Sequence, residues 1–172
     1  HMSTLGVNAV VITSNKVFLI KRIDFDIWAL PGGGVEDGES LEATAIRETK
    51  EETNIDIKVE RFVGVFSRPN WLYGGDHSIV FECSPITNNP YPDQTEVVDC
   101  QYFDLDKLPH DIWPPHLDVI NFVVKNPEST TYINQDYRWK LGNDVGWNDA
   151  VKIFKSSRLS GIEFINNNLI EK

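Results

Sequence analysis

The chain has 172 residues, of which 41% are hydrophobic and 24% are charged, as is typical of one globular domain with a sizeable core. Its formal net charge is -10 at pH 7. A chain this acidic lacks the basic surface that binds duplex nucleic acid through its phosphates, so that class of partner is excluded. A small anionic ligand is still compatible, because it needs only a few local cations or a bound metal ion.

The sequence also bears on the cellular compartment. It contains two cysteines, Cys83 and Cys100, and neither lies in a zinc-binding pattern or a disulfide framework. We therefore expect a cytoplasmic protein. We expect neither a signal peptide nor a membrane-spanning segment, because no apolar run is long enough for either. His1 and Met2 resemble the remnant of a cleaved expression tag and are left out of the fold argument.

The first half of the chain predicts a hairpin, a loop and a helix. Residues 5–12 and 17–23 are β-branched and apolar, with a short polar stretch between them, which favours a β-hairpin. Residues 24–39 are rich in glycine and predict a loop. Ser40 is a suitable N-cap for a helix over 41–53, where every residue is compatible with a helix.

The second half predicts more strands and a second helix. Strands are expected at 56–67, at 78–83 and near 96–104, and a helix at 116–125. Together the elements predict an α+β fold in which helices sandwich a sheet. We place one domain at 3–125 and expect 126–172 to be an ordered extension packed on it, because this segment holds several aromatic residues. Whether it serves as a lid, a dimer contact or a substrate wall stays open.

The helix at 41–53 carries acidic residues on the side that should face the core. At 100° per residue, Leu41, Ala45, Glu48 and Glu52 fall within roughly 60° of one another. Buried carboxylates that repel each other are costly, and a divalent cation such as Mg²⁺ removes that cost. The alternative is an ordinary solvated acidic face whose charges pair with those of nearby basic residues.

The spacing around this helix resembles the Nudix box, G-x5-E-x7-R-E-U-x-E-E-x-G-U, where U is a bulky aliphatic residue. The matching positions are Gly33, Glu39, Arg47, Glu48, Glu51, Glu52 and Ile55. Two positions depart from it: Thr49 stands in place of an aliphatic residue and Asn54 in place of glycine. Asparagine is the residue after glycine that best tolerates a left-handed helix end, so we expect the turn to be kept.

The resemblance implies a mixed β-sheet between helices and a Mg²⁺ site, in which Mn²⁺ can substitute. Metal ligands are then Glu48, Glu52, Glu51 and the Gly33 carbonyl, while Glu39 and Arg47 support the loop and helix. Glu51 and Glu52 also belong to the expected catalytic set. For the general base we prefer Glu96, which lies outside the box, with Asp93 and Glu82 as alternatives.

Further residues are candidates for substrate binding, and each has an ordinary structural explanation as well. Arg22 and Arg68 could bind phosphate, because guanidinium groups suit phosphate oxygens. His77 could donate a hydrogen bond. Three aromatic residues could stack on a base, although aromatic residues pack in cores just as readily: Trp28, Trp71 and Tyr73.

The expected function is Mg²⁺-dependent hydrolysis of a pyrophosphate linkage in a nucleoside diphosphate joined to another moiety. Metal-activated water would attack phosphorus. The expected partner is a small nucleotide-like substrate, with no duplex nucleic acid and no membrane, and a homodimer is compatible. The alternatives are a non-catalytic ligand sensor on the same fold and a related metal-dependent isomerase or phosphatase.

Overall fold

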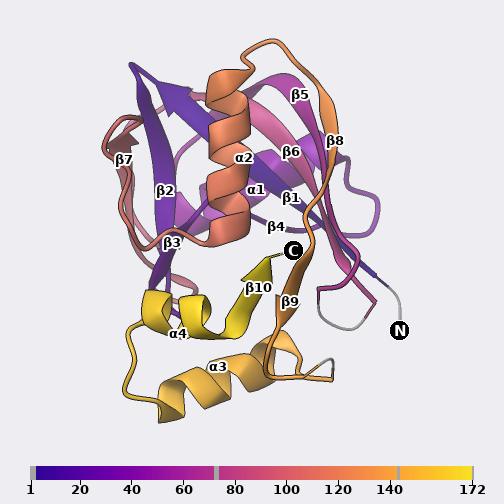
Figure 1. Cartoon of the computed structure of the whole chain (residues 1–172). Helices are drawn as coiled ribbons and strands as arrows, with labels where there is room; N and C mark the ends of the chain where they lie inside the picture. The colour runs from indigo at the N-terminus through magenta and orange to yellow at the C-terminus, as the bar shows by residue number, and fades with distance from the viewer. Residues whose placement is uncertain (1–2, 72–73, 143, 172) are drawn as a thin grey trace.

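A computed structural model describes residues 3–71, 74–142 and 144–171. The sheet forms its upper part in Figure 1, and the two C-terminal helices with the last two short strands lie beneath it. The strands are β1 Thr4–Thr13, β2 Lys16–Arg22, β3 Ile27–Ala29, β4 Gly32–Gly34, β5 Ile57–Arg68, β6 Asp76–Pro85, β7 Val97–Asp104, β8 Thr131–Asn134, β9 Tyr137–Trp139 and β10 Leu169–Glu171. The helices are α1 Leu41–Thr53, α2 Pro114–Lys125, α3 Trp147–Ser156 and α4 Gly161–Asn168.

Eight strands form one mixed sheet, with the order β3-β2-β1-β6-β5-β8 and with β4 paired to β1 and β7 paired to β2. β1 runs parallel to β6, and β5 runs parallel to β8, while the other pairs are antiparallel. The long β1 strand is central, because it pairs with β2, β4 and β6 along its length. Strand β1 therefore joins β2, β3 and β7 on one side of the sheet to β6, β5 and β8 on the other.

Helices cover the two faces of this sheet, with α2 in front and α1 behind in Figure 1. The core accordingly divides into two clusters. Ala45 of α1 packs in one cluster, whereas Val119, Ile120 and Val123 of α2 pack in the other. The expected α+β sandwich of helix, mixed sheet and helix is confirmed.

Residues of the C-terminal extension pack on the rest of the chain at several points. β8 extends the sheet beside β5, and β9 pairs with β10. Phe164 of α4 stacks on Phe25 with ring centroids 5.8 Å apart. Gly161, the first residue of α4, lies so close to the Phe25 carbonyl that a Cβ atom there would collide with it. The extension is thus joined to the loop between β2 and β3.

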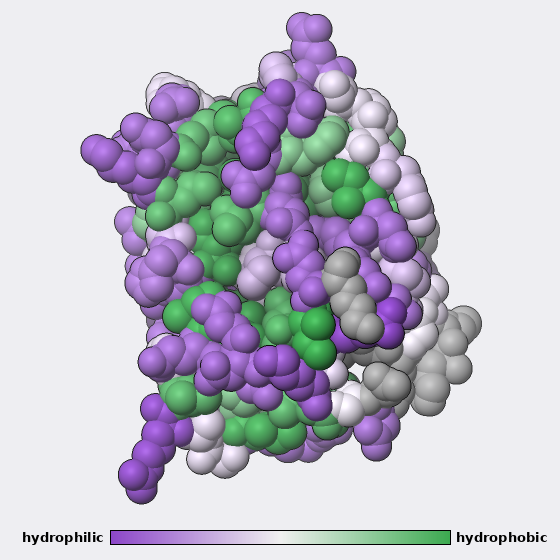
Figure 2. All heavy atoms as spheres, viewed as in Figure 1, coloured by the Kyte–Doolittle hydropathy of each residue, from purple (hydrophilic) through white to green (hydrophobic). Residues whose placement is uncertain are grey.

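On the face shown in Figure 2, hydrophobic side chains gather over the α2 region and again over the α3–α4 region, with hydrophilic side chains between them. Val124 of α2 and Ile153 of α3 are among the exposed apolar residues, at 46% and 40% exposure. No helix in the described residues has the length and apolar character needed to cross a membrane.

Most predicted elements agree with the structure, and two predictions need correction. Residues 24–39 are not a continuous loop, because β3 and β4 lie within them. The second helix begins at Pro114, two residues before the predicted start, since a proline is tolerated in the first turn of a helix. Helix α1 has the predicted bounds.

Candidate active site

Helix α1 begins and ends as its sequence indicates. The Ser40 hydroxyl accepts a hydrogen bond from the Ala43 N–H at 3.1 Å, which satisfies a free donor at the helix start. Asn54 ends the helix with φ 60° and ψ 9°, the expected left-handed conformation. Thr49 is fully buried and donates its hydroxyl hydrogen bond to the Ala45 carbonyl at 2.8 Å. Both departures from the Nudix box are therefore accommodated locally.

Glu52 is a buried carboxylate next to the glycine strand β4. It is 5% exposed, and its Oε2 atom accepts a hydrogen bond from the Gly32 N–H at 3.0 Å. Burial raises the pKa of Glu52 to about 8, and the nearby Glu48 and Glu96 charges also raise it, against the lowering effects of Gly32 and Arg22. Without a cation, this group holds its proton to unusually high pH.

Glu48 lies one helical turn from Glu52 and packs against Gly33. A Cβ atom added to Gly33 would collide with the Glu48 carboxylate, so this close approach requires glycine. Burial raises the pKa of Glu48 above its usual range, although its partner Arg47 acts in the opposite direction. The helix and the glycine strand thus enclose two carboxylates whose ionised forms are unfavourable.

Arg47 links the helix to the preceding loop. Its guanidinium group contacts both Glu39 oxygens, from Nε at 2.8 Å and from Nη2 at 2.9 Å, and also the Gly34 carbonyl at 3.1 Å. The hydrogen bonds from Arg47 hold the pKa of Glu39 down at about 2. Nη1 reaches Glu48 at 2.9 Å and Glu51 at 3.1 Å. Arg47 therefore organises the acidic residues as well as the loop.

The donor set can be compared with what a divalent metal ion requires. Within the described parts of the chain, no three His, Cys, Asp or Glu side chains already form a metal-binding cluster. Glu48 and Glu51 instead contact Arg47, and Glu51 is the most exposed of the three glutamates. The chemistry nevertheless fits a hard cation, because Glu48 and Glu52 are oxygen donors whose burial is costly without one.

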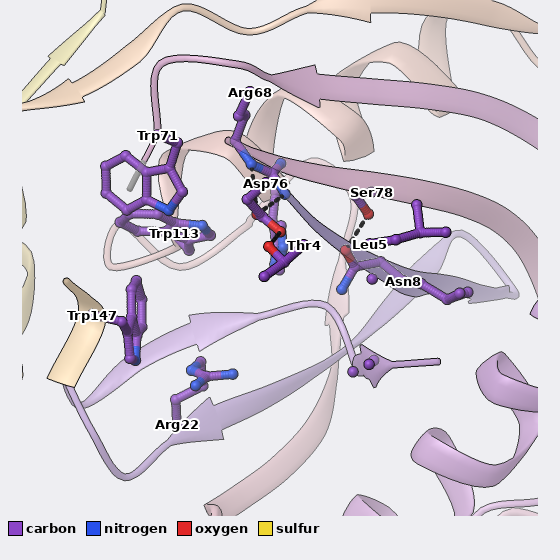
Figure 3. Close-up of a pocket in the computed structure, with 16 residues that line it drawn as sticks. Thr4, Leu5, Asn8, Arg22, Arg68, Trp71, Asp76, Ser78, Trp113 and Trp147 are labelled. Carbon is purple, nitrogen blue, oxygen red and sulfur yellow. Dashed lines mark hydrogen bonds and ion pairs between the residues drawn. The ribbon is translucent and has the colours of Figure 1, made fainter. Parts of the chain in front are cut away.

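A cavity of about 320 Å³ lies beside the glycine strand. Figure 3 shows Trp71, Trp113 and Trp147 on one side of it, Arg22 below them, and Asn8 and Ser78 on the opposite side. Its size is at the lower end of the range for small-molecule sites. An aromatic wall with a few polar groups is suited to a planar ring that carries an anionic substituent.

Two predicted arginines line this cavity. Burial lowers the pKa of Arg22, but its ion pair with Asp24 raises it overall, and the charges of the nearby Glu52 and Glu96 raise it further. Arg22 therefore connects the cavity electrostatically with the buried carboxylates. Arg68 is 4% exposed and is held by Asp76, to which it donates hydrogen bonds from Nε and Nη2 at 3.1 and 2.6 Å. Its charge is already paired.

Glu96 and its two alternatives have different surroundings. Glu96 is exposed, and its charge raises the pKa of Glu52. Asp93 instead organises its own loop, where its carboxylate accepts hydrogen bonds from the N–H groups of Thr95 at 3.1 Å and Val97 at 2.9 Å. Glu82 forms an ion pair with Arg61 at 2.7 Å. Of the three, Glu96 is the one whose carboxylate accepts no hydrogen bond and forms no ion pair within the part of the chain that the structure describes.

Three other predicted substrate-binding residues do not add to the cavity. Two of them have partners elsewhere in the fold, and the third lies outside the described residues. Trp28 is 6% exposed, packs in the α2 core cluster and does not line the cavity. His77 also lies outside the cavity lining, and its Nδ1 atom is 2.9 Å from the Ser67 hydroxyl. Tyr73 lies outside the described residues.

His116 and Trp147 are among the cavity-lining residues that the sequence interpretation missed. His116, in the first turn of α2, accepts a hydrogen bond at Nδ1 from the Leu30 N–H at 3.0 Å. Burial lowers the pKa of His116 well below its usual value, and the charges of Arg68 and Arg22 lower it further. Trp147 comes from the extension, 76 positions after the stacking candidate Trp71, and local pattern analysis cannot bridge such a separation. Only the tertiary fold brings these side chains together.

Comparisons with known proteins agree with this architecture. The NUDIX domain family matches residues 2–122. The chain is 34% identical over 109 residues to a putative 8-oxo-dGTP diphosphatase from Bacillus subtilis, covering 63% of this chain and 71% of that protein. It is 32% identical over 158 residues to an RNA pyrophosphohydrolase from Campylobacter jejuni, covering 87% and 89%. A solved UDP-X diphosphatase structure is 27% identical, with a TM-score of 0.64 and coverage of 77% and 68%.

A mixed sheet between helices, with glutamates of one helix packed against a glycine strand, defines a hydrolase of phosphoric anhydrides when combined with these relatives. The chain belongs to the Nudix hydrolase family. The family and the enzyme class expected from the sequence, a pyrophosphohydrolase, are therefore confirmed.

Proposed function

We propose that this Nudix hydrolase cleaves the pyrophosphate linkage of a nucleoside diphosphate joined to another moiety. The observation that carries the proposal is a pair of carboxylates one helical turn apart. The buried Glu52 carboxylate accepts a hydrogen bond from the Gly32 N–H, and the Glu48 carboxylate packs closely against Gly33. Such a pair is costly in a ligand-free protein, and a site for cations and phosphate offsets that cost.

In this proposal Mg²⁺ is held by Glu48 and Glu52, with Glu51 and the Gly33 carbonyl as further ligands, and Mn²⁺ can substitute. The ion would supply charge neutralisation for phosphate oxygens and a water of lowered pKa. The chain's own part is to present oxygen donors on a rigid helix. A cation would compete with Arg47 for Glu48 and Glu51, because Arg47 contacts both.

Other residues of the chain would orient the substrate and move the proton. Arg22 lines the cavity and is close enough to Glu52 for the two charges to interact, so its guanidinium group is suited to bind phosphate oxygens there. Glu96 is exposed beside the same carboxylates and is our candidate to accept the proton of the attacking water. Arg47 and Glu39 act as supports that fix the loop before the helix.

The relatives do not agree on one substrate. Their names refer to 8-oxo-dGTP, to RNA and to a UDP-linked compound. The net charge of -10 favours a small substrate over a long polyanion. A cytoplasmic location and a homodimer stay predictions from the sequence.

The test is a substrate panel with the purified protein and Mg²⁺. It contains nucleoside triphosphates, nucleotide sugars, ADP-ribose, dinucleoside polyphosphates and a short 5′-triphosphate RNA, each with and without EDTA. We expect chelator-sensitive release of two phosphate-bearing fragments from one class. Release of orthophosphate alone would favour a phosphatase. A product with the same mass as the substrate would favour an isomerase. Binding of a compound without turnover would favour a ligand sensor.

Two variants localise the activity. Glu52→Gln removes the charge of the proposed ligand with almost no change in shape, and turnover should fall by a factor of about 100 or more. Glu42→Gln is the matched control, because Glu42 is an exposed glutamate in the first turn of the same helix. Full activity in Glu52→Gln would overturn the metal assignment.

A further inference from the structure

The cavity and the C-terminal extension are physically connected. Trp147, the first residue of α3, lines the cavity although it lies outside the matched family domain. Its indole N–H donates a hydrogen bond to Asp24 Oδ2 at 2.8 Å. The Trp147 ring meets Phe25 edge-on, with centroids 4.8 Å apart. The side chain is therefore fixed in place before any ligand arrives.

Trp147 also holds Arg22 in the cavity. The Arg22 guanidinium carbon lies 5.4 Å from the centroid of the Trp147 ring, and Asp24 contacts both residues. A cation over an indole ring is stabilised by the ring's negative face. The arginine proposed to bind phosphate is thus positioned by a residue of the extension.

The extension also supports the part of the aromatic wall that Trp71 forms. Trp139 of β9 packs on Trp71 with ring centroids 4.6 Å apart. Gln135 accepts a hydrogen bond from Arg68 Nη1 at 2.9 Å. Trp113 meets Trp147 edge-on at 5.6 Å, so the aromatic wall continues from the family domain into the extension.

The cavity also contains a polar group suited to a heterocycle. His116 accepts the Leu30 N–H at Nδ1, so in the neutral side chain the proton is on Nε2. The depressed pKa of His116 agrees with this neutral form. Among the described residues no acceptor for Nε2 is found, and His116 lines the cavity. A ring carbonyl or ring nitrogen of a ligand can accept this hydrogen bond.

We propose that the cavity binds the heterocyclic base of the substrate, and that the extension completes this base site through Trp147. The volume of about 320 Å³, the aromatic wall and the His116 donor fit a base. Arg22 also lines the cavity, beside Trp147, and its charge interacts with that of Glu52 on α1. This inference rests on the proposed function. It adds that residues beyond 122 take part in substrate recognition.

Binding without catalysis tests the inference separately from hydrolysis. Calorimetric titrations in EDTA compare UMP and AMP with ribose 5-phosphate, which has the phosphate and sugar but no base. We expect at least one nucleotide to bind about tenfold more tightly than ribose 5-phosphate. Trp147→Leu should lose this advantage of the base, whereas Trp147→Phe, which keeps an aromatic ring, should retain most of it. Chelator-sensitive hydrolysis without base-dependent binding would overturn only this inference.

Tyr132→Leu is the matched control, since Tyr132 is a 70% exposed aromatic residue of β8 in the same extension. It should bind nucleotides like the unaltered protein. Equal loss in both leucine variants, or no loss in Trp147→Leu, would contradict the inference.

A second measurement does not depend on the folding of Trp147→Leu. The chain has five tryptophans, and Trp147→Phe identifies the indole N–H signal of Trp147 in a ¹H–¹⁵N spectrum of the unaltered protein. We expect UMP or AMP to shift this signal more than ribose 5-phosphate does, because the base would contact the Trp147 ring, whereas the phosphate would act on it only through Arg22. A signal that responds to none of the three, or to all three alike, would overturn the role of Trp147.

Discussion

The carboxylate of Glu52 accepts a hydrogen bond from the backbone N–H of Gly32 at 3.0 Å, which joins the last turn of α1 to strand β4. This hydrogen bond holds Glu52 on the side of the helix that faces the core, where it is 5% exposed although burial of a carboxylate charge is unfavourable. This contact places the acidic residues of the Nudix box directly behind the glycines that line the cavity.

In the absence of metal, the contribution of Glu52 to the stability of the protein should fall as the pH rises from about 5 to 9. The folded state keeps the Glu52 proton up to a pKa of about 8, whereas the unfolded chain loses it near the usual 4.5. Because the folded state binds more protons in this interval, the free energy of unfolding decreases with pH. Urea denaturation in EDTA at several pH values measures the slope.

Glu52→Gln should flatten this slope, since the amide does not titrate, while the exposed control Glu42→Gln should keep it. Adding Mg²⁺ to the unaltered protein at pH 8 to 9 should raise its stability, because an ion that binds only the folded state stabilises it. An equal slope in Glu52→Gln and the unaltered protein would show that another group is responsible.

The sequence predicted α1 and its acidic stripe well, because the signals are local. Ser40 and Asn54 mark the ends of a continuous run of helix formers, and 100° steps place Glu48 and Glu52 on one side. The short strand β4 was missed because it consists of three glycines, which have low strand propensity. It is a strand only because its backbone pairs with Val7 and its neighbours in β1.

Of the cavity, the sequence offered Arg22, Arg68 and Trp71 as candidates. Other cavity residues could not be predicted, because their contacts join residues that are far apart in the chain. His116 contacts Leu30, and Trp147 contacts Asp24 across 123 positions. Trp28 illustrates the opposite error: as an aromatic residue near the box it was a reasonable stacking candidate, yet it packs against Phe103 in the core. Only the fold distinguishes an aromatic wall from an aromatic core.

Gly33→Ala should reduce turnover more than it reduces stability. A Cβ atom at position 33 would collide with the Glu48 carboxylate, which must then move from its place beside the glycine strand. We expect kcat to fall by about tenfold or more, because small displacements of metal ligands are costly for catalysis. Gly34→Ala is the matched control, since a Cβ atom there meets nothing within 4 Å. Steady-state kinetics and thermal unfolding of the two variants would decide, and equal kcat values would contradict the prediction.

Arg47→Lys should lower both thermal stability and activity, despite keeping the charge. The guanidinium group contacts both oxygens of Glu39 and the Gly34 carbonyl at once, and an ammonium group cannot reproduce this fork. We expect Tm to fall by about 2–4 °C, which corresponds to the loss of roughly one net interaction. Lys50→Arg in the same helix is the control. A Tm unchanged in Arg47→Lys would show that the bidentate geometry contributes little.

His116 should make the protein less stable as the pH falls below about 6.5. Its folded-state pKa is depressed by burial and by Arg68 and Arg22, so the folded protein stays neutral at this position while the unfolded chain takes up a proton. His116→Asn should remove this loss between pH 6.5 and 5, because its Oδ1 atom can still accept the Leu30 N–H and does not titrate. His110→Asn, at an exposed position, should leave the acid profile as it is. Denaturation curves of the three proteins at pH 5, 6 and 7 test this, and an acid-sensitive His116→Asn variant would assign the effect to other groups.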